Sequence, residues 1–334
     1  MEPRVTGSSP VLPTIPQRQV LDLPLFYYHN IIFIMFSKDK KIILDVDTGI
    51  DDALAIILLS KTLGSQIIGI TTCGGNVGVT QTTKNTLAIL ELLGSDVSVY
   101  KGSAKPLSSK QFVEAFDYHG NDGLCNVDLP VTRSQEAKDA VDFIVESSKK
   151  YGDNLVIISV APPTNIAKAF IKYPEIAKQI SQLYLMGGAI NVPGNSTKYA
   201  EFNFFQDPLS VKMIFDNFRE VNLIPLDVTH KCLIDIKDLT NIKSKSCSGK
   251  FIIKAIKNWY AFFGNPNNRQ FELYDPLAVS AILGDFLNFK NGNFTIETEG
   301  DKAGSVVPGR NMINYAEAVK SQEFMDFFYK IINL

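Results

Sequence analysis

The chain has 334 residues, of which 45% are hydrophobic and 20% are charged, and its formal net charge is -2. This composition is typical of a folded globular protein that is long enough for one large domain or two small ones. A charge near zero without a basic patch excludes the electrostatic footprint of a nucleic-acid-binding protein and a polybasic membrane-binding segment, so we expect neither partner.

The N-terminal residues differ in composition from the rest of the chain. Residues 1–19 are rich in Pro, Ser, Thr and Arg and lack an apolar period, which is typical of disorder. The apolar run 25–36 that follows is too short to span a bilayer, and a weak membrane anchor is the alternative. Because Met35 leads directly into a strong strand, we expect residues 1–34 to be a disordered or non-native extension and residues 35–334 to be the folded domain.

Short apolar runs alternate with amphipathic stretches from Lys41 onward. The predicted strands are 41–46, 66–72, 97–100, 154–160 and 182–186. The predicted helices are 52–63, 80–93, 135–150, one near 165–170 and one that begins at Pro208. This alternation predicts a single α/β domain with a Rossmann-like, mostly parallel sheet that is flanked by helices on both faces. Ligands of such sheets bind beyond the carboxyl ends of the strands.

The last third of the chain has a less regular pattern. Residues 231–274 are predicted to be mostly helical and contain the aromatic cluster Trp259, Tyr260, Phe262 and Phe263. Two interpretations of this cluster stay open, a mobile lid that excludes water from a site and a stripe that faces the core. Residues 285–334 contain strand-like and helical pieces that we expect to close the domain.

The four cysteines are Cys73, Cys125, Cys232 and Cys247. None forms a CxxC pair, and no histidine stands at a spacing typical of zinc sites. Disulfides are rare in reducing compartments, and this cysteine pattern gives no disulfide framework. We therefore predict a cytoplasmic protein.

Four carboxylates follow the first predicted strand within eight positions, at Asp45, Asp47, Asp51 and Asp52. Carboxylates this close to a buried strand cannot all ionise without a partner. Helix capping with solvated surface acids would account for one or two of them. A bound divalent cation accounts for all four, and oxygen ligands select a hard ion, Ca²⁺ or Mg²⁺.

The run from Asp45 to Ala53 resembles the DxDxGxDDA signature of the inosine–uridine-preferring nucleoside hydrolases. The resemblance continues in order from about residue 41 to residue 320. The matching segments are Gly74–Val77 (GGNV), His119–Leu124 (HGNDGL), Pro163–Ala167 (PTNIA), Met186–Gly188 (MGG), Gly194–Asn195 with Ala200–Phe204 (AEFNF) and Asp207–Pro208, and Asp275–Ala278 (DPLA). Each motif is weak alone, but their common order is specific, and almost every one follows a predicted strand. The resemblance implies the nucleoside hydrolase fold and the hydrolysis of ribonucleosides to ribose and a free base.

The resemblance also implies a metal site and a catalytic base. Ca²⁺ would be held by Asp47, Asp52, Asp275 and the backbone carbonyl of Val160, where the family often has Thr. Because Ca²⁺ lowers the pKa of water only modestly, a base is still needed, and the resemblance gives that role to Asp47. Water would add at C1′ through an oxocarbenium-like transition state. Asp45 would support the site without binding the ion.

The remaining motifs are predicted to bind the ribose. The residues are Asp51, Asn76, Met186, Asn195, Glu201, Asn203 and Asp275, with Met186 packed beneath the sugar. Carboxylates and amides are suitable partners for a polyol. Turn formation beside glycine is the alternative for the two asparagines Asn76 and Asn195, helix capping is the alternative for Asp275, and a place in the core is the alternative for Met186. Family members are commonly homodimers or homotetramers, so a homo-oligomer is expected.

One position departs from the best-known subgroup of the family, which has His immediately before the late Asp. This chain has Tyr274 there. A purine-preferring subgroup has Trp, which stacks on the base, and Tyr274 could stack in the same way or donate a proton through its hydroxyl. A normal tyrosine pKa near 10 suits acid catalysis poorly. His119 is predicted to lie in the base pocket as a second candidate proton donor; a loop histidine without a catalytic role is the alternative.

Three other classes of protein share some of these sequence features or the same fold. Asp45-Val46-Asp47 also resembles the start of haloacid-dehalogenase-type Mg²⁺ phosphatases, in which Asp45 would be the nucleophile, but Gly49 stands where that motif has Thr or Val. A non-catalytic nucleoside-binding protein, or a hydrolase of other N-ribosides, stays open because of Tyr274. A metal-free sugar-binding protein is disfavoured by the aspartate cluster. The sequence does not separate purine from pyrimidine substrates.

Overall fold

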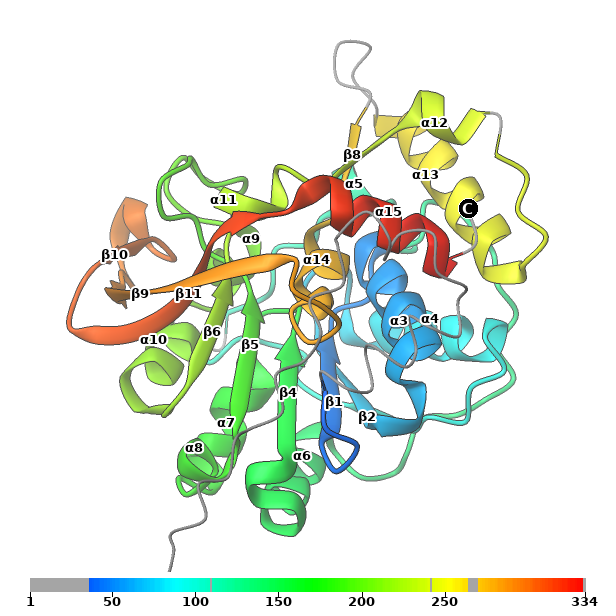
Figure 1. Cartoon of the computed structure of the whole chain (residues 1–334). Helices are drawn as coiled ribbons and strands as arrows, with labels where there is room; N and C mark the ends of the chain where they lie inside the picture. Colours follow the sequence, from blue (N-terminus) through cyan, green and yellow to red (C-terminus); the bar gives the residue numbers. More distant parts are fainter. Residues whose placement is uncertain (1–35, 109, 241, 264–269, 333–334) are drawn as a thin grey trace, which may run out of the picture.

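One sheet of nine strands organises the part of the chain that the computed structural model describes, which is residues 36–108, 110–240, 242–263 and 270–332 (Figure 1). Its order is β10-β9-β11-β6-β5-β4-β1-β2-β3. The strands are β1 (Lys41–Val46), β2 (Ile67–Thr72), β3 (Val99–Lys101), β4 (Leu155–Ser159), β5 (Gln182–Met186), β6 (Val221–Ile224), β9 (Leu287–Ile296), β10 (Val306–Pro308) and β11 (Asn311–Val319). The predicted extension 1–34 lies outside the described residues.

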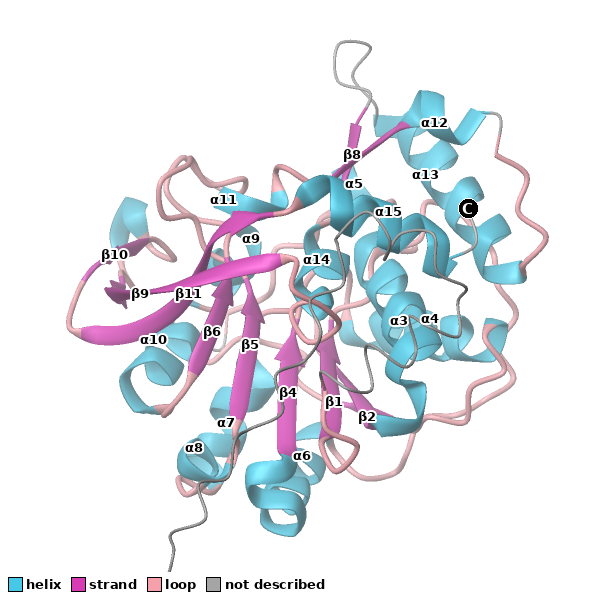
Figure 2. Ribbon diagram, viewed as in Figure 1, coloured by secondary structure: helices cyan, strands magenta, loops and turns pink. Residues whose placement is uncertain are grey.

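The sheet is parallel from β3 to β6 and onward to β11, and only β9 and β10 run antiparallel to their neighbours. The predicted mostly parallel α/β fold is therefore confirmed. Two further strands, β7 (Leu233–Asp235) and β8 (Gln270–Glu272), pair separately. In Figure 2 this small pair lies beyond the end of the main sheet, close to α12 and α13.

Helices lie on both faces of the sheet (Figure 2). In chain order they are α3 (Ile50–Leu63), α4 (Val79–Leu92), α5 (Phe116–His119), α6 (Ala140–Tyr151), α7 (Thr164–Lys172), α8 (Ile176–Gln179), α9 (Phe202–Gln206), α10 (Pro208–Asn217), α11 (Leu226–Thr229), α12 (Ile236–Thr240), α13 (Cys247–Phe263), α14 (Tyr274–Ser280) and α15 (Ser321–Ile332). None of these helices is long and apolar enough to cross a membrane.

Two apolar cores form because side chains alternate along each strand. Ile42 and Leu44 of β1 pack in the core that contains buried residues of α3, α13, α14 and α15. Ile43, between them, packs on the opposite face with residues of α6, α7, α8 and α10. All six residues of β1 except Lys41 are buried, as expected for a strand covered on both faces. This central strand delivers the aspartate cluster to the carboxyl edge of the sheet.

The boundaries of some elements differ from the prediction. The helix predicted at 135–150 begins at Ala140, because the Asp139 side chain accepts a hydrogen bond from Val141 N at 2.8 Å and caps the helix. The backbone N–H of Glu136 instead pairs with the carbonyl of Val99 at 2.8 Å and extends the chain beside β3. The strand β6 was not predicted, and the C-terminal pieces close the domain by adding three strands to the main sheet.

Candidate active site

Asp45 lies at the end of β1, where neighbouring strands surround its buried carboxylate. The register places it opposite Thr71 of β2 and Ser159 of β4. Thr71 Oγ1 donates to it at 2.6 Å, Ser159 Oγ at 3.0 Å and Asn165 Nδ2 at 2.8 Å. Burial raises the pKa of Asp45 to about 6, although these three hydrogen bonds act to lower it. A carboxylate so fully bonded, and away from the cavity described below, suits the predicted supporting role better than that of a nucleophile.

Asn165, in the first turn of α7, extends this support to two more segments. Its Nδ2 also donates to the Thr72 carbonyl at 3.0 Å, and its Oδ1 accepts from Ser103 N at 2.9 Å. The side chain is completely buried. One amide therefore joins β1, the end of β2 and the loop after β3. Its PTNIA motif was recognised in the sequence, but this contact was not predicted.

Asp47 and Asp52 are held by the tight turn between β1 and α3. Asp52 accepts from Asp47 N at 3.0 Å, Gly49 N at 2.9 Å and Asn76 Nδ2 at 3.0 Å. Asp47 Oδ2 accepts from Asn76 N at 2.7 Å, whereas its buried Oδ1 has no hydrogen-bond partner in the described part of the chain. A Cβ at Gly75 would lie 2.0 Å from Asp47 Oδ2, so only glycine fits there.

Asp51 and Asp275 meet from the first turns of α3 and α14, and they share a side-chain hydrogen bond. Carboxylate oxygens of Asp51, Asp52 and Asp275 lie within 4.8 Å of one another, and all three residues are buried. Burial, followed by repulsion from Asp52, raises the pKa of Asp51 to about 8. Burial and the neighbouring carboxylates likewise raise the pKa of Asp47 and Asp275 well above the ordinary range.

These four aspartates fit a hard divalent cation. They cannot ionise together in a buried site without a compensating charge, and oxygen atoms are the ligands that such an ion prefers. Asp47 Oδ1 and Asp51 Oδ1 are buried oxygens that accept no hydrogen bond from any described residue, as expected of atoms that bind something else. Three of the predicted ligands, Asp47, Asp52 and Asp275, belong to this group, and Asp51, predicted to bind ribose, belongs to it as well.

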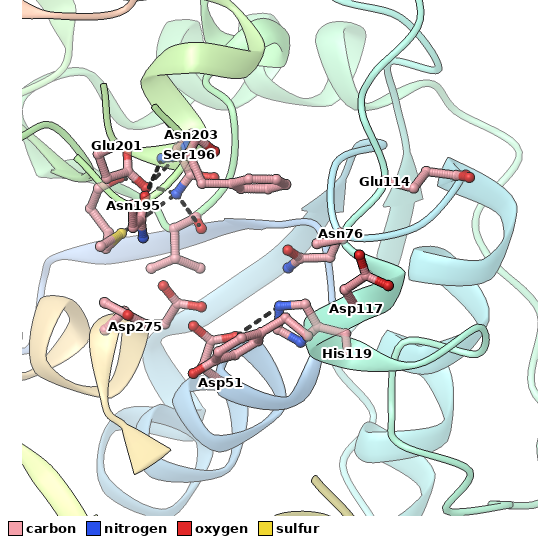
Figure 3. Close-up of a pocket in the computed structure, with 16 residues that line it drawn as sticks. Asp51, Asn76, Glu114, Asp117, His119, Asn195, Ser196, Glu201, Asn203 and Asp275 are labelled. Carbon is pink, nitrogen blue, oxygen red and sulfur yellow. Dashed lines mark hydrogen bonds and ion pairs between the residues drawn. The ribbon is translucent and has the colours of Figure 1, made fainter. Parts of the chain in front are cut away.

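A cavity of about 380 Å³ opens above this cluster at the carboxyl edge of the sheet. Its lining residues are Asp51, Asn76, Glu114, Ala115, Asp117, Tyr118, His119, Val160, Met186, Asn195, Ser196, Glu201, Phe202, Asn203, Tyr274 and Asp275. Figure 3 shows Asp51 and Asp275 close together, with Asn195, Glu201 and Asn203 on one side of the cavity and Asn76 and His119 on another. Every predicted site residue except Asp47 and Asp52 lines it, and those two lie directly behind.

Asn203 and Glu201 form a rigid polar wall at the start of α9. Asn203 Nδ2 donates to the Val160 carbonyl at 3.0 Å and to the Met186 carbonyl at 3.2 Å. Glu201 accepts from the backbone N–H groups of Gly188 at 3.0 Å, Asn203 at 2.9 Å and Phe204 at 3.1 Å. Burial raises the pKa of Glu201 to about 7 against the effect of these donors. The wall thus couples the ends of β4 and β5 to α9.

His119 lies at the end of the short helix α5, with its ring against the start of α3. Its Nδ1 accepts a hydrogen bond from Ile50 N at 3.1 Å, and its Nε2 lies 3.9 Å from Asp51 Oδ1. A backbone N–H can only donate, so Nδ1 carries a lone pair and the single ring proton is on Nε2. Burial lowers the pKa of His119 to about 3. These contacts count against the predicted role of His119 as a proton donor in the charged form.

Tyr274 lines the cavity at the start of α14 and belongs to a polar network. Its hydroxyl hydrogen-bonds the Glu272 carboxylate, which also accepts from His230 Nδ1 at 2.7 Å. The His230 and Tyr274 rings are edge to face, 6.2 Å apart. Although burial acts in the opposite direction, the hydrogen bonds from His230 and Tyr274 lower the pKa of Glu272 overall. An ionised Glu272 only accepts hydrogen bonds, so the Tyr274 proton points toward it.

The aromatic cluster of α13 divides between core and surface. Trp259 is 7% exposed and packs edge to face on Tyr118 at 5.5 Å and on Phe271 at 5.1 Å. It does not line the cavity, whereas Tyr118 does. Phe262 is 60% exposed. For Trp259 the core interpretation is therefore the better one, and it supports the cavity wall from behind.

Six lining residues were not predicted, namely Glu114, Ala115, Asp117, Tyr118, Ser196 and Phe202. Four of them come from the loop-rich stretch 101–133, which has no apolar period to place it in a fold. Gln206 ties this loop down, because its Oε1 accepts from Val113 N at 2.9 Å and its Nε2 donates to the Val113 carbonyl. The only available signal was proximity in sequence to the HGNDGL and AEFN motifs.

Comparison with known proteins shows similarity to nucleoside hydrolases. The family model for the inosine-uridine preferring nucleoside hydrolases matches residues 42–326. The chain is 30% identical to a probable uridine nucleosidase 2 of Arabidopsis thaliana over 84% of this chain and 88% of that protein. It is 33% identical to the pyrimidine-specific ribonucleoside hydrolase RihA of Shewanella woodyi over 78% of this chain and 85% of that protein.

Solved structures of nucleoside hydrolases also superpose well on this chain. A purine-preferring ribonucleoside hydrolase from Gardnerella vaginalis superposes with a TM-score of 0.80 at 34% identity, covering 88% of this chain and 99% of that one. The plant nucleoside hydrolase PpNRh1 superposes with a TM-score of 0.83 at 26% identity, covering 88% and 98%. The fold and the buried acidic cavity are thus those of an N-glycosyl hydrolase. The chain belongs to the inosine–uridine-preferring nucleoside hydrolase family, and the phosphatase alternative is excluded.

Proposed function

We propose that this protein hydrolyses the N-glycosidic bond of ribonucleosides to ribose and a free base, and that it requires Ca²⁺. One observation carries the proposal. Carboxylate oxygens of Asp51, Asp52 and Asp275 lie within 4.8 Å of one another beside the cavity, and Asp47 is buried close enough to repel them electrostatically. One oxygen of Asp47 and one of Asp51 lack a hydrogen-bond partner within the described residues. Such a cluster is stable only when a cation or protons neutralise it.

Asp47, Asp52, Asp275 and the carbonyl of Val160 would hold the ion. The short distances among the oxygens of Asp51, Asp52 and Asp275 also support Asp51 as a direct or nearby ligand. When bound, Ca²⁺ supplies charge compensation and fixes the positions of the sugar hydroxyls and of water. Flexible all-oxygen sites suit Ca²⁺ better than Mg²⁺, which demands stricter geometry.

Asp47 is the proposed general base. Asn76 N fixes one carboxylate oxygen at 2.7 Å, so the other, Oδ1, can take a proton from the attacking water. The water oxygen then bonds to C1′ while the C1′–N bond breaks and its electron pair goes to the leaving base. Positive charge develops on the sugar in this step, and the surrounding carboxylates stabilise it electrostatically.

The ribose would be gripped by Asn76, Asn195, Glu201 and Asn203, above Met186. The support is their common position on the cavity wall and the fixed geometry of Asn203 and Glu201. A side chain that is already oriented by backbone contacts loses little entropy when it binds a hydroxyl. A sugar that lacks a hydroxyl would leave these buried groups unpaired, so ribosides are favoured over deoxyribosides.

The base would leave against the ring of Tyr274, which we propose acts by stacking. The orientation of its hydroxyl toward Glu272 supports stacking over proton donation. Named relatives include both pyrimidine-specific and purine-preferring enzymes, so the base preference must be measured. We further infer that the protein acts in the cytoplasm, because all four cysteines are free thiols, which suits a reducing compartment. We also infer a homo-oligomer, and light scattering would give its size.

The test is ribose release from inosine, adenosine, guanosine, uridine and cytidine, with Ca²⁺ and then with a chelator. We expect ribose release, and we expect the chelator to abolish it. Asp47→Asn should lower the rate by about a thousandfold, which is the typical cost of losing a general base. The exposed Asp301→Asn serves as the matched control and should leave the rate unchanged. If none of these nucleosides is cleaved while calorimetry detects bound Ca²⁺, the protein is a binding protein or a hydrolase of other N-ribosides, and the proposal is wrong for these substrates.

A further inference from the structure

The cavity is strongly acidic along its whole length. Among the described residues that line it are five carboxylates and no lysine or arginine, and Asp47 and Asp52 lie directly behind. One divalent cation would compensate only two of these charges. Asp117, in the first turn of α5, is exposed and projects beside Asn76 and His119, away from the metal cluster (Figure 3). Negative charge therefore extends from the sugar subsite toward the subsite of the leaving base.

The same subsite offers aromatic surface. Tyr118, Phe202 and Tyr274 line the cavity, and Trp259 and Phe271 pack behind Tyr118. The face of an aromatic ring attracts a cation, and nearby carboxylates strengthen this attraction. Aromatic rings grouped around a ligand are a means by which proteins recognise quaternary nitrogen.

Among the described residues, neither of the two candidate proton donors, Tyr274 and His119, directs its proton at a neutral leaving base. The Tyr274 hydroxyl donates to Glu272, which His230 also contacts at 2.7 Å. The His119 ring is fixed by Ile50 N so that Nδ1 cannot carry a proton, and its Nε2 faces Asp51. A neutral purine or pyrimidine must either leave as an anion beside these carboxylates or take its proton from solvent.

We propose that the leaving groups preferred by this site carry a fixed positive charge on the ring, as in ribosides of N-alkylated purines or of pyridinium bases. The inference rests on the proposed hydrolase function and specifies its substrate class. In the step, water bonds to C1′, the C1′–N electron pair returns to the cationic ring, and the base leaves neutral. One proton passes from water to Asp47 and then to solvent. No general acid is required, because the base leaves neutral. Asp117 and the aromatic rings attract the cationic ring when the substrate binds.

The experiment compares 7-methylguanosine with guanosine, in mildly acidic buffer where the methylated ring stays cationic. The wild-type enzyme should cleave 7-methylguanosine with a kcat/KM at least about a hundredfold higher than its kcat/KM for guanosine. Guanosine needs a general acid that the site does not supply, and a general acid typically accelerates a reaction by at least about a hundredfold. Part of this ratio reflects the weaker bond of the methylated substrate, so the variants carry the test. Asp117→Asn should lower the ratio about twofold to fivefold, mainly through KM for 7-methylguanosine, and added salt should have a similar effect. Asp301→Asn, whose side chain lies outside the cavity, should not change the ratio.

Tyr274→Phe and His119→Asn give the decisive result. If either residue donates a proton, its variant loses about a hundredfold or more in guanosine cleavage while 7-methylguanosine is spared, and the inference is overturned. We expect each variant to change both substrates by similar factors. An unchanged ratio in Asp117→Asn would also overturn the inference, even if guanosine cleavage establishes the proposed hydrolase. Failure to cleave any riboside would instead contradict the proposed function itself.

Discussion

Replacing Asn165 by Leu should show how strongly one buried amide holds the active-site edge of the sheet. The side chain makes three hydrogen bonds of 2.8–3.0 Å, to the Asp45 carboxylate, the Thr72 carbonyl and Ser103 N. Leucine has a similar size, so the change removes the bonds without opening a large cavity. Loss of the bond to a charged group costs about 1.5–3 kcal/mol, and each of the two orphaned backbone groups costs about 1–3 kcal/mol.

The greater hydrophobicity of leucine returns about 1–2 kcal/mol, which leaves a net loss of about 4 kcal/mol in the free energy of unfolding. That is a large part of a typical total of about 5–15 kcal/mol. Urea unfolding followed by circular dichroism measures it. Thr71→Val, which removes only the 2.6 Å bond to Asp45, should cost less, and the exposed Asn291→Leu should cost almost nothing. A loss below about 1 kcal/mol in Asn165→Leu, or a larger loss in Thr71→Val, would refute the reasoning.

Three further predictions concern the metal, pH and the loop over the cavity. Saturating Ca²⁺ should raise the melting temperature by about 3–8 °C over the chelated protein, and Asp52→Asn should abolish the shift; a shift that persists would place the ion elsewhere. Because burial raises the pKa of Glu201 to about 7, its stabilising contribution is present below the unfolded pKa near 4.5 and is lost as pH rises through about 7. We would measure urea unfolding in the presence of chelator between about pH 5 and pH 8. Over this range the free energy of unfolding of the wild type should fall by on the order of 3 kcal/mol relative to that of Glu201→Gln. If the difference between the two proteins stays constant with pH, this pKa is contradicted. Gln206→Met removes both bonds to Val113 and should raise KM about fivefold to tenfold with little change in kcat, whereas unchanged kinetics would show that the loop does not need this clamp.

The sequence predicted the strands and helices that can be recognised from the hydrophobic pattern of a short segment. The strands β1, β2, β4 and β5 are short apolar runs, and the helices between them have clear ends, so periodicity located them. β6, with only four residues, was missed, and the strands β9 to β11 were seen only as pieces. Their pairing brings β11 beside β6 across almost a hundred residues, and no local signal encodes that register.

The candidate site follows the same division. Asp47, Asp51 and Asp52 were predicted because a dense group of carboxylates needs a compensating charge wherever it lies, whereas Asp275 was predicted only from the resemblance of its DPLA segment to the family. Asp117 and Tyr118 were not, because they stand in a loop whose position depends on contacts with distant residues such as Gln206. Similarly, the tautomer of His119 depends on Ile50 N, sixty-nine residues away, and only the folded chain brings the two together.

The distribution of hydrogen bonds separates supporting from reactive carboxylates within one short motif. Asp45 and Asp52 each accept three hydrogen bonds from the protein. Asp47 and Asp51 are also buried, and each keeps one oxygen that accepts no hydrogen bond from a described residue. A buried, unpaired carboxylate oxygen destabilises a fold unless it binds a ligand, so its presence twice within one short motif supports the proposed ligand site. The motif thus combines two aspartates whose hydrogen bonds fix the geometry of the turn, of which Asp52 also belongs to the proposed metal site, with two that each keep one oxygen for a ligand.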